Sequence, residues 1–355
     1  MRGVFMTKRM ALCILSALLA AVCMGCGSQN NTKNVSEDDV TPAAPTETLM
    51  SELSGTPIAT PSATAAPTEA PTATPTDALT PGAETTDITV QCPADILAKR
   101  DTVSYASFEH GTYYSSICDK TRGYTVLLPP GYTTEKKYPV VYLLHGIFGN
   151  ENSFAGDKTL PVLIDNMMAD GLCGEFILVC PDIFAGGNGF VTTPAFTAEA
   201  MAAYDRFAQE LITCLMPEIN GKYAVIEGRD GTAIAGFSMG GRETLYTSLL
   251  YPEYFSEVCA IAPAPGIVEC TDKFMHHEGS LKEEEVKYKE GTILPNHILI
   301  CCAKRDSVVG QYPSSYAQLY EKNGIPRIWY EIPDADHDQR AQYSGLYNFL
   351  QWIGK

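Results

Sequence analysis

From residue 89 onward, short apolar runs alternate with segments whose apolar residues recur at the helical period. The apolar runs predict β-strands at residues 124–128, 140–144, 176–180, 232–237, 258–262, 297–302 and 327–332. The helical period predicts helices at residues 201–217, 240–251, 313–323 and 341–353. Apolar strands that alternate with helices indicate an α/β fold, with a mainly parallel central sheet and helices on both faces. The earliest strands, within residues 103–128, are expected to pair antiparallel at one edge.

The N-terminal part of the chain differs from the rest in composition. A basic start, an apolar run at residues 11–21 and a small-residue stretch ending at Cys26 predict a signal peptide over residues 1–26. Its end resembles the lipobox of bacterial lipoproteins, whose cysteine is acylated, although Cys23 stands where leucine is usual. We therefore expect an extracellular, cell-surface lipoprotein with a lipid anchor on Cys26, and the alternatives are simple secretion or an uncleaved anchor. Residues 27–88 are rich in threonine, proline and alanine, which predicts a disordered linker before one domain at 89–355.

Charge and hydropathy exclude several classes of protein. The 355 residues include 25 Lys and Arg against 42 Asp and Glu, a formal net charge of −17, so no nucleic-acid partner is expected. No internal stretch approaches the roughly 18 to 20 apolar residues that a membrane-spanning helix needs. The cysteines after residue 89 are odd in number and several lie in apolar strand runs. Buried thiols are therefore expected rather than a disulfide framework.

The strongest local signal is the stretch Gly236–Gly241, which has the pattern G-x-S-x-G. It follows the apolar strand 232–237 directly and opens the helix 240–251. A sharp turn from strand to helix holds such a serine in a strained conformation and exposes its hydroxyl at the carboxyl end of the strand. Ser238 is therefore the candidate nucleophile. The alternative is a glycine-rich turn in which the serine only caps the helix.

A serine hydroxyl needs a base, and the base needs an acid that fixes its tautomer. The chain order in this type of fold is serine, acid, histidine. Asp306 follows the strand 297–302, and His337 follows the strand 327–332, so both are expected at the same sheet edge as Ser238. We predict His337 as the base and Asp306 as its acid.

Other histidines and acids fit these roles less well. His145 and His297 adjoin strands upstream of the serine or at the wrong end, and single histidines of this kind are usually structural or solvated. The acids next to His337, which are Asp334, Asp336 and Asp338, are too close to it in sequence to reach the correct ring nitrogen easily. His276-His277-Glu278 lacks the spacing of metal ligands, so no metal or cofactor is expected.

The loop after the strand 140–144 is a candidate for one side of an oxyanion hole. It begins His145-Gly146-Ile147, and backbone N–H groups of Gly146 and Ile147 are the predicted donors on this side. The N–H of Met239, next to the nucleophile, is the predicted donor on the other side. The alternative is an ordinary glycine-rich connection between a strand and a helix.

Together these motifs resemble the α/β-hydrolase fold of esterases, and among them the family-one carbohydrate esterases, which include feruloyl and acetylxylan esterases. The similar stretches, within residues 110–353, are 111–116, 128–132, 142–146, 233–241, 306–307, 337–338 and 345–350. The resemblance implies a serine esterase that removes feruloyl groups from plant cell-wall polysaccharide such as xylan. Acetyl or other small acyl esters are the alternative substrates, and a non-catalytic glycan-binding surface module is the alternative function.

The chain also departs from the family. The acidic cluster around His337 and the polar insertion from Glu269 to Gly291 have no counterpart among the family motifs, and the insertion is a candidate border of the acyl pocket. Candidates for contact with an aromatic acyl group are Phe148, Phe184, Phe190 and Phe196.

Overall fold

A computed structural model of the protein describes residues 88–355. The predicted signal peptide, the lipidation of Cys26 and the linker up to residue 87 lie outside the described residues. Within the described part, one sheet of eight strands forms the centre of the domain.

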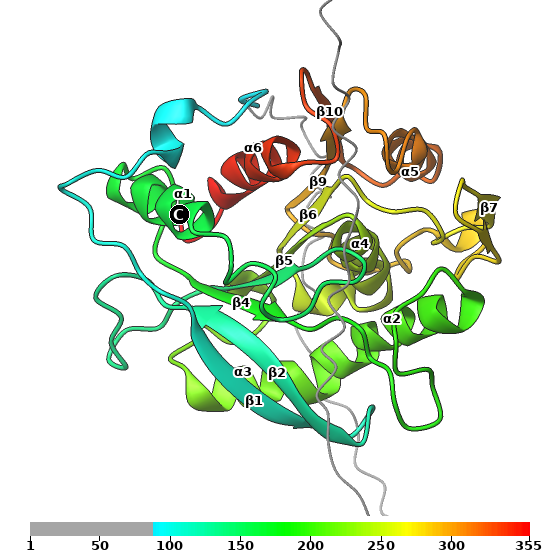
Figure 1. Ribbon diagram of the computed structural model, residues 1–355, viewed down its shortest axis with the longest axis horizontal. Coiled ribbons are helices and arrows are strands. Elements are labelled where there is room, and N and C mark those ends of the chain that lie inside the picture. Colours follow the sequence, from blue (N-terminus) through cyan, green and yellow to red (C-terminus); the bar gives the residue numbers. More distant parts are fainter. Residues whose placement is uncertain (1–87) are drawn as a thin grey trace, which may run out of the picture. The chain divides into compact units, whose positions relative to one another are not determined.

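Neighbouring strands in the sheet are not always consecutive along the chain, since β4 lies between β2 and β3 (Figure 1). In spatial order the strands are β1 (Glu109–Ser115), β2 (Lys120–Leu127), β4 (Ile177–Pro181), β3 (Val140–Leu144), β5 (Thr232–Phe237), β6 (Glu257–Ile261), β9 (His297–Ala303) and β10 (Ile328–Ile332). β1 pairs antiparallel with β2, and β2 pairs antiparallel with β4. From β4 to β10 every pair of neighbours is parallel, so the carboxyl ends of these strands form one edge.

Successive residues of a strand point to opposite faces of the sheet, and in the parallel strands both sets are apolar. Helices therefore cover both faces. The helices are α1 (Thr159–Ala169), α2 (Ala198–Glu210), α3 (Met216–Lys222), α4 (Met239–Leu250), α5 (Tyr312–Lys322) and α6 (Gln339–Leu350). α1 and α6 pack on one face in a core with Val141 and Leu143. α2, α4 and α5 pack on the other face in a core with Tyr142 and Leu144 (Figure 1).

Several shorter elements complete the domain. A π-helical turn at Leu211–Leu215 joins α2 to α3, and 3-10 turns lie at Ala94–Leu97, Arg229–Gly231, Pro252–Tyr254 and Glu283–Glu285. The short strands β7 (Cys270–Thr271) and β8 (His276–His277) form a separate antiparallel hairpin within the insertion after β6.

The α/β prediction is confirmed, and the predicted strands and helices all form with ends shifted by a few residues. The sequence did not predict α1. Eight of its eleven residues are buried, so it lacks the polar face that marks an amphipathic helix, and Pro161 interrupts the pattern. Proline is tolerated there because the first turn of a helix has no intrahelical partner for its N–H groups.

The thiols of the domain are free, as expected. The free cysteines between residues 88 and 355 are Cys92, Cys118, Cys173, Cys180, Cys214, Cys259, Cys270, Cys301 and Cys302. Most are buried, where burial raises the pKa of the thiol, for example to about 12 for Cys173 and Cys301. Within residues 88–355, no helix combines the length and the apolar character needed to cross a bilayer.

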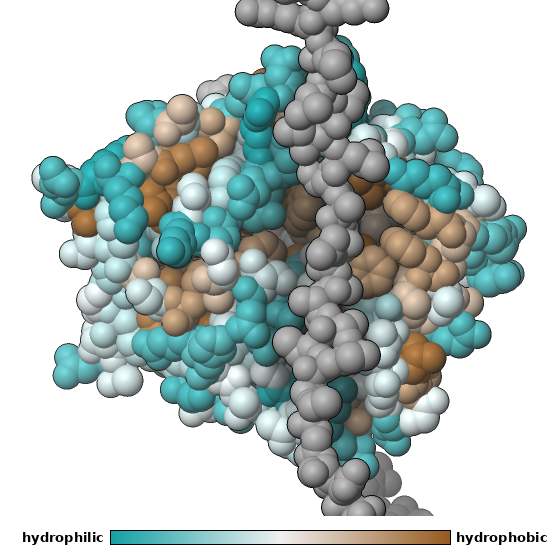
Figure 2. All heavy atoms as spheres, in the orientation of Figure 1, coloured by the Kyte–Doolittle hydropathy of each residue, from teal (hydrophilic) through white to brown (hydrophobic). Residues whose placement is uncertain are grey.

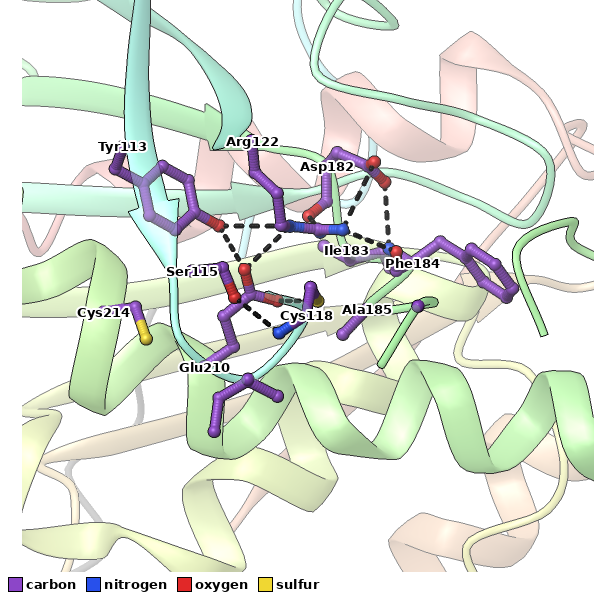
Figure 3. A network of polar contacts seen from close by, with 12 residues as sticks. Tyr113, Ser115, Cys118, Arg122, Asp182, Ile183, Phe184, Ala185, Glu210 and Cys214 are labelled. Atoms are coloured by element: carbon purple, nitrogen blue, oxygen red, sulfur yellow. Dashed lines mark hydrogen bonds and ion pairs between the residues drawn. The ribbon is translucent and has the colours of Figure 1, made fainter. Parts of the chain in front are cut away.

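A buried polar network connects the β1–β2 hairpin to α2 and to the segment after β4 (Figure 3). Arg122 Nε lies 2.7 Å from Glu210 Oε1, and the Tyr113 hydroxyl donates to the same oxygen at 2.7 Å. The guanidinium of Arg122 also donates to the backbone carbonyls of Asp182 and Phe184. Burial opposes the charged form, but Tyr113, Glu210 and Asp182 together raise the pKa of Arg122. The charge of Arg122 is therefore retained in the interior only because it is paired.

Removal of one partner of this network should destabilise the domain. Glu210→Leu leaves the guanidinium of Arg122 buried without its main counter-charge, so we expect the free energy of unfolding to fall by about 3–5 kcal/mol. The double variant Arg122→Met/Glu210→Leu removes both charges and should recover much of this loss. Denaturant titration of the three proteins measures the effect. Equal stability of the single and the double variant would contradict the pairing.

Candidate active site

Ser238 lies at a tight turn between β5 and α4, as the G-x-S-x-G pattern predicts. Its φ of 60° is in the left-handed region, which is strained for a residue other than glycine. The turn leaves no room for side chains beside the serine. A Cβ on Gly236 would lie 2.2 Å from the carbonyl oxygen of Gly240, and a Cβ on Gly240 would lie 2.0 Å from that of Leu144. The two glycines are therefore required by the close approach of strand and helix.

The backbone of Ser238 is fixed by three hydrogen bonds. Its N–H donates to the carbonyl of Ile261 at 2.9 Å, and its carbonyl accepts from the N–H groups of Arg242 and Ala264 at 3.0 Å each. The strained conformation is thus held by bonds to β6, to α4 and to the segment after β6. Strain persists in a folded protein when the surroundings determine the conformation in this way.

Asp306 and His337 are brought together from the ends of β9 and β10. His337 Nδ1 lies 2.8 Å from Asp306 Oδ2. The other oxygen, Oδ1, accepts the N–H groups of Val308 and Val309 at 2.9 Å each. Burial by itself would raise the pKa of Asp306, but the hydrogen bond with His337 and the two amides outweigh burial and lower it. Asp306 is therefore an anion that orients the imidazole of His337 through Nδ1.

The position of His337 is further set by its neighbours. Asp338 caps α6 by accepting the N–H groups of Arg340 and Ala341, which fixes the residue directly after His337. The imidazole of His337 packs on the ring of Phe237, with 4.5 Å between the ring centroids. Since Phe237 directly precedes Ser238, this contact puts the histidine beside the nucleophile turn. Among residues 88–355, no hydrogen bond joins Ser238 to His337, and such bonds often tighten only when substrate is bound.

The three predicted oxyanion donors are unpaired within the described part of the chain. The backbone N–H groups of Gly146, Ile147 and Met239 have no hydrogen-bond partner there. Gly146 faces the nucleophile, because a Cβ on this residue would lie 3.4 Å from Ser238 Cβ and 3.8 Å from Ser238 Oγ. Ile147 and Met239 line the same pocket as Ser238. Backbone N–H groups on both sides of the serine are thus available to an oxygen bound between them.

A small apolar pocket opens at Ser238. Its volume is about 60 Å³. Its lining residues are Ile147, Phe196, Met201, Ser238, Met239, Ala264, Pro265, Asp272, Phe274, His277, Val308 and Val309. The insertion Glu269–Gly291 does border this pocket, through the β7–β8 hairpin and its turn. Any group larger than the pocket has to extend beyond its mouth.

Three phenylalanines from distant segments form an aromatic cluster at the mouth of the pocket. The rings of Phe196 and Phe274 are stacked, with centroids 4.4 Å apart and planes at 3°, and Phe148 meets Phe196 edge to face at 5.3 Å. The three side chains are 38%, 42% and 56% exposed, in the order Phe196, Phe274, Phe148. On the face drawn in Figure 2, an apolar area lies beside the position that β7 has in Figure 1. Exposed aromatic rings grouped in this way are typical of a binding surface.

Two of the predicted acyl contacts lie elsewhere. Phe184 is buried and packs edge to face on Tyr204 in the core. Phe190 packs against the guanidinium of Arg206 at 3.9 Å and is not part of the pocket lining. Their sequence context did not distinguish them from Phe148 and Phe196, because exposure depends on the packing of the whole domain.

Phe274 and Cys302 are site residues that the sequence did not predict. Phe274 lies in the turn of the β7–β8 hairpin, within an insertion that carries no family motif. Cys302, at the end of β9, places its Sγ 3.5 Å from Asp306 Oδ2 and donates to it. The position of Cys302 four residues before Asp306 was the available signal, but an apolar strand run favours a packing role for a cysteine.

Residues 88–355 contain no group of three or more histidine, cysteine, aspartate or glutamate side chains that is arranged to bind a metal ion. His276, His277 and Glu278 do not form such a group. His276 Nε2 lies 3.9 Å from Glu278 Oε1, whereas His277 is buried and faces Asp272.

Comparison with known proteins gives consistent results. Residues 115–291 match the family model described as "Putative esterase". The solved structure of a CE1 ferulic acid esterase from Anaeromyces mucronatus, in complex with ferulic acid, superposes with a TM-score of 0.72 and is 40% identical. The match covers 75% of this chain and 97% of that chain. An endo-1,4-β-xylanase/feruloyl esterase from Xylanibacter ruminicola is 32% identical over 174 residues, and an endo-1,4-β-xylanase Y from Acetivibrio thermocellus is 33% identical over 149 residues.

These matches differ in how much of the other protein they cover. The chain spans 23% and 12% of the length of these two relatives, so most of each has no counterpart in this chain. The ferulic acid esterase, in contrast, is matched over nearly its whole length. Its similarity in sequence and fold confirms the expected relationship, and the chain belongs to the CE1 esterase family.

Proposed function

We propose that the protein is a serine esterase that removes feruloyl groups from plant cell-wall polysaccharide such as xylan. One observation carries this proposal: Ser238 is held at a strained turn that opens into an apolar, aromatic-edged pocket, and the Asp306–His337 pair lies beside that turn. The similar enzyme from Anaeromyces mucronatus is described as a ferulic acid esterase, which supports the choice of acyl group.

The residues fit an acyl-enzyme mechanism. His337 Nε2 takes the proton of Ser238 Oγ as this oxygen bonds to the ester carbonyl carbon, and Asp306 stabilises the imidazolium through Nδ1. The carbonyl oxygen becomes an oxyanion facing the N–H groups of Ile147 and Met239, and Gly146 is the further candidate donor. The bond to the sugar oxygen then breaks, and His337 returns its proton to that oxygen.

The second half of the reaction uses water. His337 takes a proton from a water molecule whose oxygen bonds to the acyl carbon, and a second tetrahedral intermediate forms in the same donor pair. When it collapses, Ser238 Oγ leaves with the proton from His337 and the free acid is released. The resting enzyme is restored without any other reactant.

The aromatic cluster formed by Phe148, Phe196 and Phe274 supports an aromatic acyl group. Stacked and edge-to-face aromatic contacts contribute about 0.5–1.5 kcal/mol each beyond the area that they bury. The pocket of about 60 Å³ favours the second candidate, an acetyl ester, because an acetyl group needs little room. For a feruloyl group, the aromatic ring has to rest on the exposed phenylalanines instead.

Replacement of Phe274 by alanine separates these two candidates. Because Phe274 stacks on Phe196 at the pocket mouth, we expect Phe274→Ala to lower kcat/KM for methyl ferulate by about 10-fold, with much less change for p-nitrophenyl acetate. Phe190→Ala is the matched control, since this exposed ring lies outside the pocket lining. Acetylated xylan as a third substrate completes the comparison. Higher wild-type activity on acetylated xylan than on methyl ferulate, with no effect of Phe274→Ala, would favour an acetyl esterase.

The location of the enzyme is proposed from the sequence. The lipobox-like end at Cys26 supports a lipid anchor on the outer face of a membrane, and the Thr- and Pro-rich residues 27–88 support a tether between anchor and esterase. Such a tether would let the esterase reach insoluble polysaccharide. Simple secretion remains the alternative.

A further inference from the structure

His145 is a buried histidine that the proposed reaction does not use. It directly follows β3, its side chain is 1% exposed, and both of its ring nitrogens have partners. The N–H of Ile183 donates to Nε2 at 3.0 Å, and Asp182 Oδ1 lies farther from the same nitrogen, at 3.5 Å. The closer contact assigns a lone pair to Nε2 and the ring proton to Nδ1. Nδ1 lies 2.7 Å from the carbonyl oxygen of Gly146 and donates to it. The imidazole therefore holds one specific carbonyl of the oxyanion loop.

The carbonyl of Gly146 belongs to the same peptide unit as the N–H of Ile147. In a trans peptide these two groups point in opposite directions. The Gly146 carbonyl is held by His145 and also by the N–H of Gly149, at 3.1 Å. Its fixed direction fixes the opposite direction of the Ile147 N–H, which is unpaired and belongs to a residue that lines the pocket at Ser238.

The loop needs such support because its conformation is strained. Phe148, the next residue, has a φ of 63°, which is unfavourable for a bulky side chain. Its N–H donates to the Tyr204 hydroxyl at 3.3 Å, so it is not available to an oxyanion. Apart from the two bonds on the Gly146 carbonyl, no hydrogen bond among the described residues holds the 146–147 peptide, and its rotation would turn the Ile147 N–H away from the pocket.

The buried network of Figure 3 holds the partner of His145 in turn. Arg122 donates to the carbonyl oxygens of both Asp182 and Phe184, and Asp182 Oδ1 accepts the N–H of Phe184 at 2.9 Å. The guanidinium thus clamps the turn 182–184 from both ends. The middle residue of this turn is Ile183, whose N–H sets the orientation and the tautomer of His145.

We propose that His145 is a positioning residue of the oxyanion hole, which directs the Ile147 N–H at the developing oxyanion through its bond to the Gly146 carbonyl, and that Arg122 supports it through the turn 182–184. This inference rests on the proposed serine esterase reaction, and it assigns a function in catalysis to a buried network that is otherwise only structural. His145 itself does not touch the substrate.

Two substitutions of His145 separate its two hydrogen bonds. An asparagine side chain puts an amide near the position of Nδ1 and can still donate to the Gly146 carbonyl. A glutamine side chain puts its amide near Nε2 and can still accept from Ile183, but it loses the bond to Gly146. We expect His145→Gln to lower kcat for p-nitrophenyl acetate by about 100-fold with little change in KM, the effect of losing one oxyanion donor. His145→Asn should retain most of kcat.

Controls separate this inference from general damage and from failure of the proposed function. His297→Asn, at the opposite end of the sheet, controls for loss of a histidine, and thermal unfolding of each variant controls for folding. Inhibition by phenylboronic acid, whose serine adduct is tetrahedral, should weaken in His145→Gln and not in His145→Asn. Equal losses of kcat in the two variants, or a change in KM alone, would overturn the role of His145. A wild-type protein without esterase activity would instead overturn the proposed function.

The role of Arg122 has its own test. Arg122→Lys keeps the charge beside Glu210 but cannot clamp two carbonyls with a planar fork, so we expect a fall in kcat of about 10-fold. If Arg122 acts through His145, the losses in the double variant Arg122→Lys/His145→Gln should be smaller than the product of the single losses. Independent, multiplying losses would contradict a path through His145.

Discussion

Replacement of Ser238 by alanine is expected to lower kcat for ester hydrolysis by a factor on the order of 10⁶. Ser238 Oγ is the only group at the strained turn that can form the acyl-enzyme, so its loss removes covalent catalysis rather than weakening it. The fold should be unaffected, because Ser238 is held by its backbone and not by its hydroxyl. Release of p-nitrophenol from p-nitrophenyl acetate measures the effect.

A control and a second readout make this test specific. Ser315→Ala, in an exposed position of α5, should leave kcat unchanged. A fluorophosphonate should add to the wild-type protein at one site, as seen by mass spectrometry, and should not add to Ser238→Ala. Retention of turnover by Ser238→Ala would show that another residue is the nucleophile.

Replacement of Asp306 by asparagine is expected to lower kcat by about 10⁴-fold. The carboxylate accepts the Nδ1 proton of His337 at 2.8 Å, which leaves Nε2 free to act as the base. An asparagine amide can donate to Nδ1 instead, which favours the tautomer with its proton on Nε2 and prevents it from accepting the serine proton. Asp334→Asn is the matched control, because it removes a carboxylate three residues before His337. Its backbone φ of 57° is one that asparagine also adopts, so the substitution adds no strain. A similar loss in both variants would point to a general effect of charge.

Asp306 also makes stability depend on pH. Its pKa is lowered in the folded protein, so it contributes stability that is present above its ordinary pKa and is lost as the pH falls through the lowered pKa. The stability difference between the wild type and Asp306→Asn should therefore shrink when denaturant titrations are repeated at increasingly acidic pH. A difference that does not change with pH would indicate that Asp306 has the same pKa in the folded and the unfolded protein.

Much of the arrangement around Ser238 followed from short stretches of sequence. The strand before Ser238, the helix after it and the glycines beside it are all within a few residues of the serine. Asp306 and His337 could be chosen because parallel strands bring their carboxyl ends to one edge, so position after a strand was enough to place both residues near the nucleophile. No detailed knowledge of packing was needed.

The pocket did not follow in this way. Phe148, Phe196 and Phe274 come from three loops that carry no periodic pattern, and their stacking depends on how each loop packs on the domain. Phe184 and Phe190 have similar sequence surroundings, yet one is in the core and the other contacts Arg206. Likewise, α1 was hidden because burial on all sides removes the amphipathic pattern.

The sequence by itself determined the α/β class, the order of the main strands and of the helices other than α1, and the three side chains proposed for acyl transfer, because periodicity and turn chemistry act between residues that are close along the chain. Only the tertiary structure decided the aromatic cluster, the contact of Cys302 with Asp306 and the part that His145 and Arg122 have in shaping the loop beside Ser238. The aromatic cluster and the contacts of Arg122 join segments that are distant in sequence, and the geometry of all these contacts is set by the packing of the complete domain.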